Sequence, residues 1–186
     1  MWRTVMPALL VLMPMGCEKT KQVKETATMG QLTVTSPAFG PGKPIPKKHA
    51  YRGEGENIAP PLGWTGAPQG TRTFAVICED PDAPSSKNPR PEPWVHWVMF
   101  NIVAQRTMLA EGGPTEGTVG TNDFKERSWG GPMPPPGSGT HRYFFRVYAL
   151  DTRLDLPPAT TRAQLLQAMQ GHILAQGEVF GTYERR

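Results

Sequence analysis

Short apolar runs separated by turn-forming residues dominate this chain and predict β-strands. Residues 32–36 alternate between apolar and polar side chains and stop at Pro37, as a half-buried strand does. Residues 73–78 are apolar almost without interruption, which is typical of an interior strand covered on both faces. Further runs, rich in β-branched and aromatic residues, occupy residues 94–102, 143–150 and 178–183. The pattern therefore predicts a mainly β, sandwich-like domain.

One helix is predicted late in the chain. Thr161 and Gln164 have the spacing of a capping box, in which each residue bonds the other's backbone amide. The narrow apolar stripe that follows consists of Leu165, Leu166 and Met169. Gly171 can end the helix. Because the stripe is narrow, the helix is expected to lie on the periphery of the domain.

The N-terminal residues follow a different pattern. Residues 1–16 carry one charge, Arg3, and an apolar stretch that is too short for a permanent membrane span but has the layout of a secretory signal. The following Gly16-Cys17 is similar to the end of a bacterial lipoprotein signal, although Pro14 stands where that signal usually has Leu. We therefore expect a signal peptide over 1–16, a polar tether over 17–30 and one domain over 31–186.

With Cys17 lipidated, the chain would be anchored in a bacterial cell envelope. The alternatives are an ordinary signal that yields a periplasmic or secreted protein, or an uncleaved anchor. Only Cys78 would remain in the mature chain, so no internal disulfide could form.

Composition fits a soluble globular domain and excludes few functions. The chain has 186 residues, of which 38% are hydrophobic and 19% charged, with a formal net charge of +4. This length suits one domain. The charge is mild, and arginines are not interleaved with aromatic residues as in nucleic-acid-binding surfaces, so no nucleic acid is expected as a partner.

Four polar residues stand at the ends of the predicted strands, each on a face that is otherwise apolar. Asp80 follows the run at 73–78, His96 lies near the start of the next run, and His141 and Tyr143 open a third. Alternate residues of a strand share a face, which groups Asp80 with Cys78, and His96 with Trp94 and Val98. If the strand ends meet, two imidazoles, a carboxylate and a phenol form a pocket for an anion or a polar headgroup. Imidazoles can donate to phosphate or carboxylate, and Asp80 could hold one of them in the donating tautomer.

Other interpretations of the same residues remain open. A lone histidine in an aromatic strand is often a packed core residue, and an Asp before Pro is often a turn former. Asp80, His96 and His141 could also imitate a metal site of two histidines and one carboxylate, but they lack a local ligand spacing. No nucleophile elbow, phosphate-binding glycine loop or zinc cysteine pair is present.

A long ordered series of motifs resembles the phosphatidylethanolamine-binding protein (PEBP) family, and in particular its bacterial, Raf-kinase-inhibitor-like branch. The series consists of Thr35-Ser36-Pro37-Ala38-Phe39, Gly55 to Trp64, Asp80 to Pro84, Trp94 to Ile102, Asn122-Asp123-Phe124, Gly130 to Pro135 and His141-Arg142-Tyr143. It covers nearly the whole expected domain. The resemblance implies a large central antiparallel sheet packed against a smaller sheet, with a few short peripheral helices.

The resemblance also implies a site. The family's anion pocket corresponds here to Asp80, Trp94, His96, Met133, Pro134, His141 and Tyr143, with no cofactor and no metal. By the resemblance, the pocket would hold phosphate-like or acetate-like anions. Ala83-Pro84 and Glu92-Pro93 are candidates for cis peptide bonds near it.

Three functions are compatible with these observations. The first is a non-catalytic binding protein whose preformed pocket holds a phosphorylated headgroup, a small carboxylate or a protein partner. The second is a hydrolase or metal-dependent enzyme that uses Asp80, His96 and His141. The third is a protein-interaction module, such as an inhibitor of a kinase or another enzyme, that engages an acidic partner through basic residues at the rim.

Overall fold

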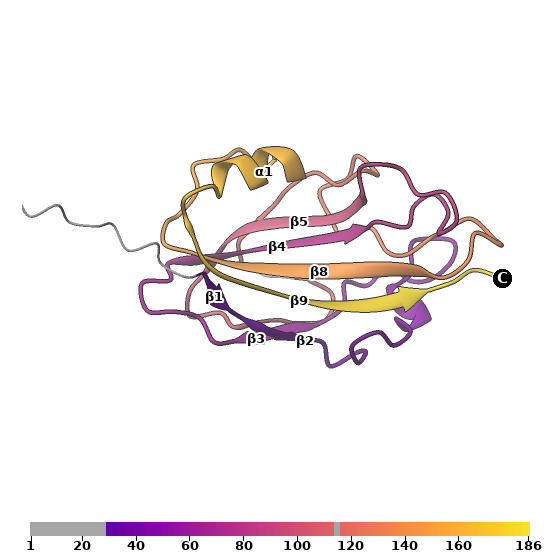
Figure 1. Cartoon of the computed structure of the whole chain (residues 1–186), viewed down its shortest axis with the longest axis horizontal. Helices are drawn as coiled ribbons and strands as arrows, with labels where there is room; N and C mark the ends of the chain where they lie inside the picture. Colours follow the sequence, from indigo (N-terminus) through magenta and orange to yellow (C-terminus); the bar gives the residue numbers. More distant parts are fainter. Residues whose placement is uncertain (1–28, 114–115) are drawn as a thin grey trace, which may run out of the picture.

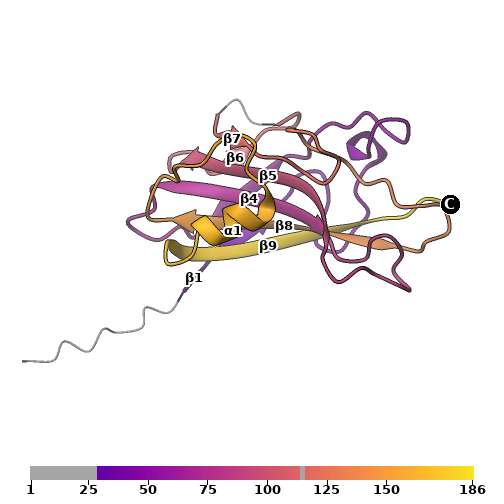
Figure 2. The same cartoon turned by 90° about the horizontal axis from the view of Figure 1, so that it is seen from above.

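The computed structural model describes residues 29–113 and 116–186, which form three layers (Figure 1). A large sheet lies in the middle, a small sheet covers one of its faces, and a short helix covers the other (Figures 1 and 2). The expected signal, Cys17 and most of the expected tether lie outside the described residues. Within the described part, no helix is long and apolar enough to cross a membrane.

The large sheet has the strand order β1-β9-β8-β4-β5-β7 and the small sheet has the order β2-β3-β6. The strands of the large sheet are β1 (Gly30–Gln31), β9 (Ile173–Tyr183), β8 (His141–Leu150), β4 (Thr73–Asp80), β5 (Trp94–Val103) and β7 (Thr118–Val119). Those of the small sheet are β2 (Thr33–Thr35), β3 (Leu62–Thr65) and β6 (Met108–Leu109). The helices are the 3-10 turn η1 (Lys47–His49) and α1 (Arg162–Ala168).

The central strand β4 is buried along its whole length, as its apolar sequence predicted. Phe74, Val76 and Cys78 pack against the small sheet in the larger core cluster. Ala75 and Ile77 point to the opposite face and pack in the cluster that includes Leu165 and Met169 of the helix segment. Covering both faces of β4 explains why its sequence does not alternate.

The prediction of an antiparallel large sheet is wrong at one edge. β1 pairs with β9 in parallel, with Gly30 opposite Ala175, so the sheet is mixed. After β1 the chain passes through Leu32 into β2 of the small sheet. One N-terminal segment therefore contributes a strand to each layer, a connection that the apolar pattern does not reveal.

The predicted helix is confirmed, and its start follows from the capping box. Thr161 accepts from the Gln164 amide, and the Gln164 side chain accepts from the Thr161 amide in return. Leu165 and Met169 are fully buried. Arg162 forms an ion pair with Glu79 of β4, which ties the helix to the sheet. The resemblance implied a few short helices; the described residues contain this one α-helix and the 3-10 turn η1.

Gly177 in β9 is predicted to be essential because Leu32, the residue between β1 and β2, passes directly over it. A Cβ at Gly177 would lie 2.1 Å from the Leu32 carbonyl oxygen, closer than any side chain can approach. We expect Gly177→Ala to lower the free energy of unfolding by about 1–3 kcal/mol, measured by urea denaturation. Gly63→Ala is the matched control, because its new methyl would meet only Thr35 at 3.6 Å, and it should stay within about 0.5 kcal/mol of the parent. Equal effects of the two substitutions would contradict this packing.

Candidate functional site

Three strands of the large sheet bring polar side chains together at one end of the domain. β4 ends there at Asp80, opposite Trp94 at the start of β5, and β8 begins there at His141. Asp82, just beyond β4, accepts from the backbone and guanidinium of Arg142 at 2.8–2.9 Å. These bonds fix the end of β4 against the start of β8.

A shift in strand register turns His96 toward this end of the inter-sheet space. Cys78 pairs with Trp97 while Glu79 pairs with Val95, so His96 has no partner of its own on β4. Such a bulge places two successive side chains on one face. His96 and Trp97 accordingly both contact Trp129. The predicted grouping of His96 with Trp94 holds, but that with Val98 is wrong, because Val98 packs on the helix side.

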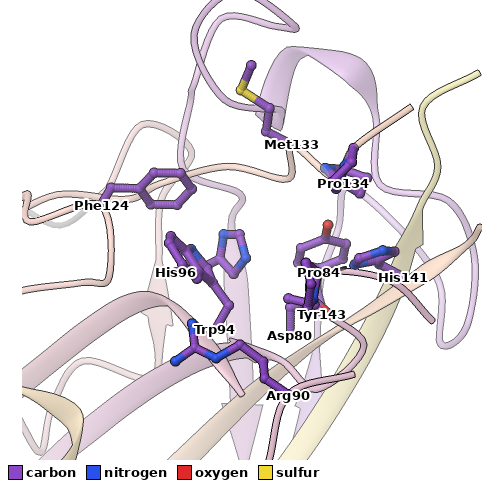
Figure 3. A pocket seen from close by; sticks show the side chains of 12 residues that line it. Asp80, Pro84, Arg90, Trp94, His96, Phe124, Met133, Pro134, His141 and Tyr143 are labelled. Carbon is purple, nitrogen blue, oxygen red and sulfur yellow. Dashed lines mark hydrogen bonds and ion pairs between the residues drawn. The ribbon is translucent and has the colours of Figure 1, made fainter. Parts of the chain in front are cut away.

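The polar residues line a cavity of about 390 Å³ (Figure 3). Every residue that the sequence placed in the site contributes to its lining: Asp80, Trp94, His96, Met133, Pro134, His141 and Tyr143. The remaining lining residues are Ala83, Pro84, Arg90, Phe124 and Pro135. The walls are mainly apolar, so the few polar groups determine what can bind.

A buried chain of hydrogen bonds holds His141 in place. Its Nδ1 donates to Asp80 Oδ2 at 2.7 Å, and its Nε2 lies 3.0 Å from Ser138 Oγ. The other Asp80 oxygen accepts from the Asp82 amide at 2.8 Å. Asp80, Ser138 and His141 are 3%, 8% and 0% exposed, so these bonds are shielded from water. The prediction that Asp80 orients an imidazole agrees with this geometry.

The order Asp80–His141–Ser138 is also the order of a serine hydrolase relay. A nucleophilic serine must face the substrate, however, and Ser138 is not among the residues that line the cavity. Its carbonyl instead accepts from Ser85 and Ser86 of the neighbouring loop. The chain of bonds therefore orients His141 and joins it to this loop.

His96 presents a different hydrogen-bonding group from the one expected. Its Nδ1 lies 2.5 Å from the Gly130 carbonyl oxygen, which can only accept, so Nδ1 carries a hydrogen. Burial lowers the pKa of His96 below 6.5, and the Gly130 carbonyl and the charge of Asp80 offset this in part. The neutral ring therefore has an unprotonated Nε2. The expectation that both imidazoles donate to a ligand has to be corrected: in the free protein His96 offers an acceptor.

Tyr143 contributes a phenol to the lining. Burial raises its pKa well above 10, and the nearby charge of Asp80 raises it further. The phenol thus stays protonated and can donate a hydrogen bond. The Tyr143 ring meets the His96 ring edge to face, with centroids 5.0 Å apart (Figure 3).

Arg90 and Phe124 complete the rim, and neither was predicted as a site residue. The Arg90 guanidinium lies 5.4 Å from the centre of the Trp94 ring, a cation–π distance. Phe124 packs edge-on against Trp94 and stacks on Tyr51. Both lie on loops without apolar periodicity; the available signals were the basic insert that contains Arg90 and the motif that contains Phe124.

Of the two candidate cis peptide bonds, Ala83-Pro84 is cis and lies at the cavity. Glu92-Pro93 is not, so that expectation is wrong. Within residues 29–113 and 116–186, no group of three or more His, Cys, Asp or Glu side chains is arranged to hold a metal ion.

Comparison with known proteins identifies the family. The profile of the family described as phosphatidylethanolamine-binding protein matches residues 35–184. The chain belongs to this family. It is 45% identical over 154 residues to a UPF0098 protein of Methanothermobacter thermautotrophicus, an alignment that covers 80% of this chain and 95% of that protein.

Solved structures of PEBP relatives agree with this assignment. A putative PEBP homologue from Chlamydia trachomatis superposes with a TM-score of 0.75 at 39% identity, over 84% of this chain and 99% of the other. YbcL of Escherichia coli, described as a member of the mammalian PEBP family, also has a TM-score of 0.75, at 33% identity over 86% of this chain and all of its own (100%). The predicted family and two-sheet fold are thus confirmed, while the Raf-kinase-inhibitor-like branch stays a prediction.

The buried histidines of this PEBP should make its stability depend on pH. Burial lowers the pKa of His96 and of His49, so the unfolded chain binds protons more readily than the folded one below pH 6.5. Protons then favour unfolding: the free energy of unfolding should fall as the pH drops below about 6.5 toward the lowered pKa of the folded state, and this loss should be absent at higher pH. Urea denaturation of the parent and of His96→Gln checks this. The variant should show a shallower slope, and identical slopes would contradict a neutral buried His96.

Proposed function

We propose that this protein is a non-catalytic binding protein whose preformed cavity holds an oxyanion. The candidate ligands are a phosphorylated headgroup, a small carboxylate or an acidic group of a protein partner. The observation that carries the proposal is that two hydrogen-bond donors, Arg90 and Tyr143, line the same cavity, whose walls are mainly apolar. Charged and neutral donors that converge in a site of low polarity favour an anion.

The fixed geometry of the lining supports binding. Hydrogen bonds from Arg142 to Asp82 and from His141 to Asp80 hold the floor in place without a ligand. Aromatic contacts between Trp94 and Phe124 do the same for one wall. A site that is ordered before the ligand arrives loses little conformational entropy on binding.

The geometry gives less support to an enzyme. Both nitrogens of His141 have protein partners, Asp80 and Ser138, so neither is free to act on a ligand in the cavity. Ser138 lies outside the lining. A base and a nucleophile that both face the bound substrate are what a hydrolase requires.

Substitution of Arg90 tests the anion site directly. Arg90→Ala should weaken the binding of inorganic phosphate and of acetate about tenfold or more, measured by isothermal titration calorimetry, because a charged hydrogen-bond donor is lost. Lys87→Ala is the matched control: it removes an equal charge from the same loop, but Lys87 does not line the cavity. An equal loss in the two variants would show that only net charge matters. No binding of either anion to the parent protein would overturn the proposal.

We further propose that the protein is a lipoprotein of the bacterial cell envelope, anchored through Cys17; the alternative is a periplasmic or secreted protein. The sequence Gly16-Cys17 after an apolar segment supports this. The position of β1 adds a geometric consequence. Gly30 pairs near the start of β9, whereas the cavity end is where Tyr183 pairs with His141. The chain thus enters the domain at the end of the sheet opposite the cavity (Figure 1).

Replacing the expected lipidation site should release the protein from membranes. In cells expressing the full chain, Cys17→Ser should move it from the membrane fraction to the soluble envelope fraction and abolish incorporation of labelled palmitate. Cys78→Ser is the control: Cys78 is buried in the domain, so its loss should leave the label in place. Labelling of the Cys17→Ser protein, or no label on the parent, would rule out this anchor.

A further inference from the structure

The hydrogen bond between His96 and Gly130 determines which atom the ring offers to the cavity. A carbonyl oxygen cannot donate, so the bond at Nδ1 assigns the hydrogen to that nitrogen. His96 lines the cavity and its ring points toward Tyr143 (Figure 3). Within residues 29–113 and 116–186, no hydrogen bond reaches Nε2, and this atom is not among the buried polar atoms that are both sealed from solvent and without a partner. In the neutral ring Nε2 carries a lone pair, which requires a hydrogen-bond donor.

The neighbouring groups do not remove this requirement. Asp80 brings a carboxylate whose two oxygens already accept from the Asp82 amide and from His141. His141 has both nitrogens engaged. The side-chain donors among the described lining residues are Tyr143, Arg90 and the indole N–H of Trp94, and they share the cavity with an acceptor at His96. A ligand that only accepts hydrogen bonds satisfies the donors but leaves the His96 lone pair facing a negative oxygen.

We propose that the cavity selects oxyanions that still carry a dissociable proton, above all phosphate monoesters and inorganic phosphate, over sulfate and phosphodiesters, with His96 as the residue that discriminates. This inference rests on the proposed anion-binding function and narrows it to a ligand class. The ligand's P–O–H group donates to His96 Nε2 while its other oxygens accept from Tyr143 and Arg90. Sulfate and a phosphodiester have no such hydrogen near neutral pH.

Protonation of His96 would turn the acceptor into a donor, so the discrimination depends on pH. The titratable and charged groups around the ring are Asp80 from β4, Asp123 from the loop after β7, His141 and Tyr143 from β8, and Arg90 at the rim. Burial opposes the charged ring and outweighs the favourable effect of the two carboxylates. Sulfate and diester binding should therefore improve only at acidic pH, where His96 gains a proton.

Titration calorimetry with three small probes tests the proposal. Methyl phosphate, dimethyl phosphate and sulfate are titrated into the protein at about pH 7, where a phosphate monoester with a second pKa of about 6 is present in both singly and doubly charged forms. Dimethyl phosphate carries one negative charge and sulfate two, so the two comparison anions bracket the charge of the monoester. Methyl phosphate should bind at least about tenfold more tightly than either, because the other two anions leave the buried acceptor of His96 without a hydrogen bond, which weakens their binding.

The binding reaction should also take up a proton. At about pH 8 methyl phosphate is mostly a dianion, and its binding should draw close to one proton from the buffer. Titrations in two buffers with different ionisation enthalpies measure this number. No proton uptake would contradict the inference.

Two variants of His96 separate the discriminating residue from the cavity itself. His96→Gln can donate from its amide to Gly130 and present its carbonyl oxygen to the cavity. It should keep the preference for methyl phosphate and lose the gain in sulfate binding at acidic pH. His96→Leu removes the acceptor and should bring the three probes to within about threefold of one another.

The outcomes distinguish this inference from the function on which it rests. Equal affinity of the parent for all three probes would overturn the selectivity and leave the anion site intact. No binding of any probe would overturn the anion site itself. A comparison of soluble methyl phosphate with phosphatidylcholine vesicles, alone or mixed with phosphatidic acid, then shows whether the monoester is taken from solution or from a membrane.

Discussion

The buried pair of Asp80 and His141 is the interaction on which the site depends. It joins the end of β4 to the start of β8 through a 2.7 Å bond in an environment with almost no solvent exposure. A carboxylate in such a place is tolerated only when its oxygens are satisfied, and both are. Loss of one partner would leave the other buried without a match, which is far more destabilising than removal of both. This constraint keeps the strand ends together and the cavity open between them.

The sequence predicts the parts of the fold that follow from local pattern. The continuous burial of β4 and the capping box at Thr161 and Gln164 depend on residues a few positions apart, and both are present as expected. The meeting of Asp80 and His141 could also be anticipated, because both stand at strand ends and share a face with apolar neighbours. The parallel pairing of β1 with β9 could not be anticipated, because the paired residues Gly30 and Ala175 lie far apart in the sequence.

The direction and hydrogen-bonding role of the side chains in the site were harder to predict than the identity of the residues that line it. All the residues inferred from the motifs reach one cavity, but the bulge that turns His96 toward it leaves no mark in the apolar pattern. The tautomer of His96 is set by Gly130, which lies 34 positions away. Arg90 and Phe124 reach the rim from loops, where side-chain direction has no period to reveal it. Counting two imidazoles as two donors was therefore wrong, although both rings line the cavity.

His96 is neutral and carries its hydrogen on Nδ1 in the free protein, and the proposed selectivity of the cavity depends on this tautomer. Long-range proton–nitrogen NMR of the histidine side chains at neutral pH measures this directly. We expect the nitrogen chemical shift of His96 Nε2 to be that of an unprotonated ring nitrogen, and that of Nδ1 to be that of a protonated one. A hydrogen on Nε2, or a doubly protonated ring, would contradict it.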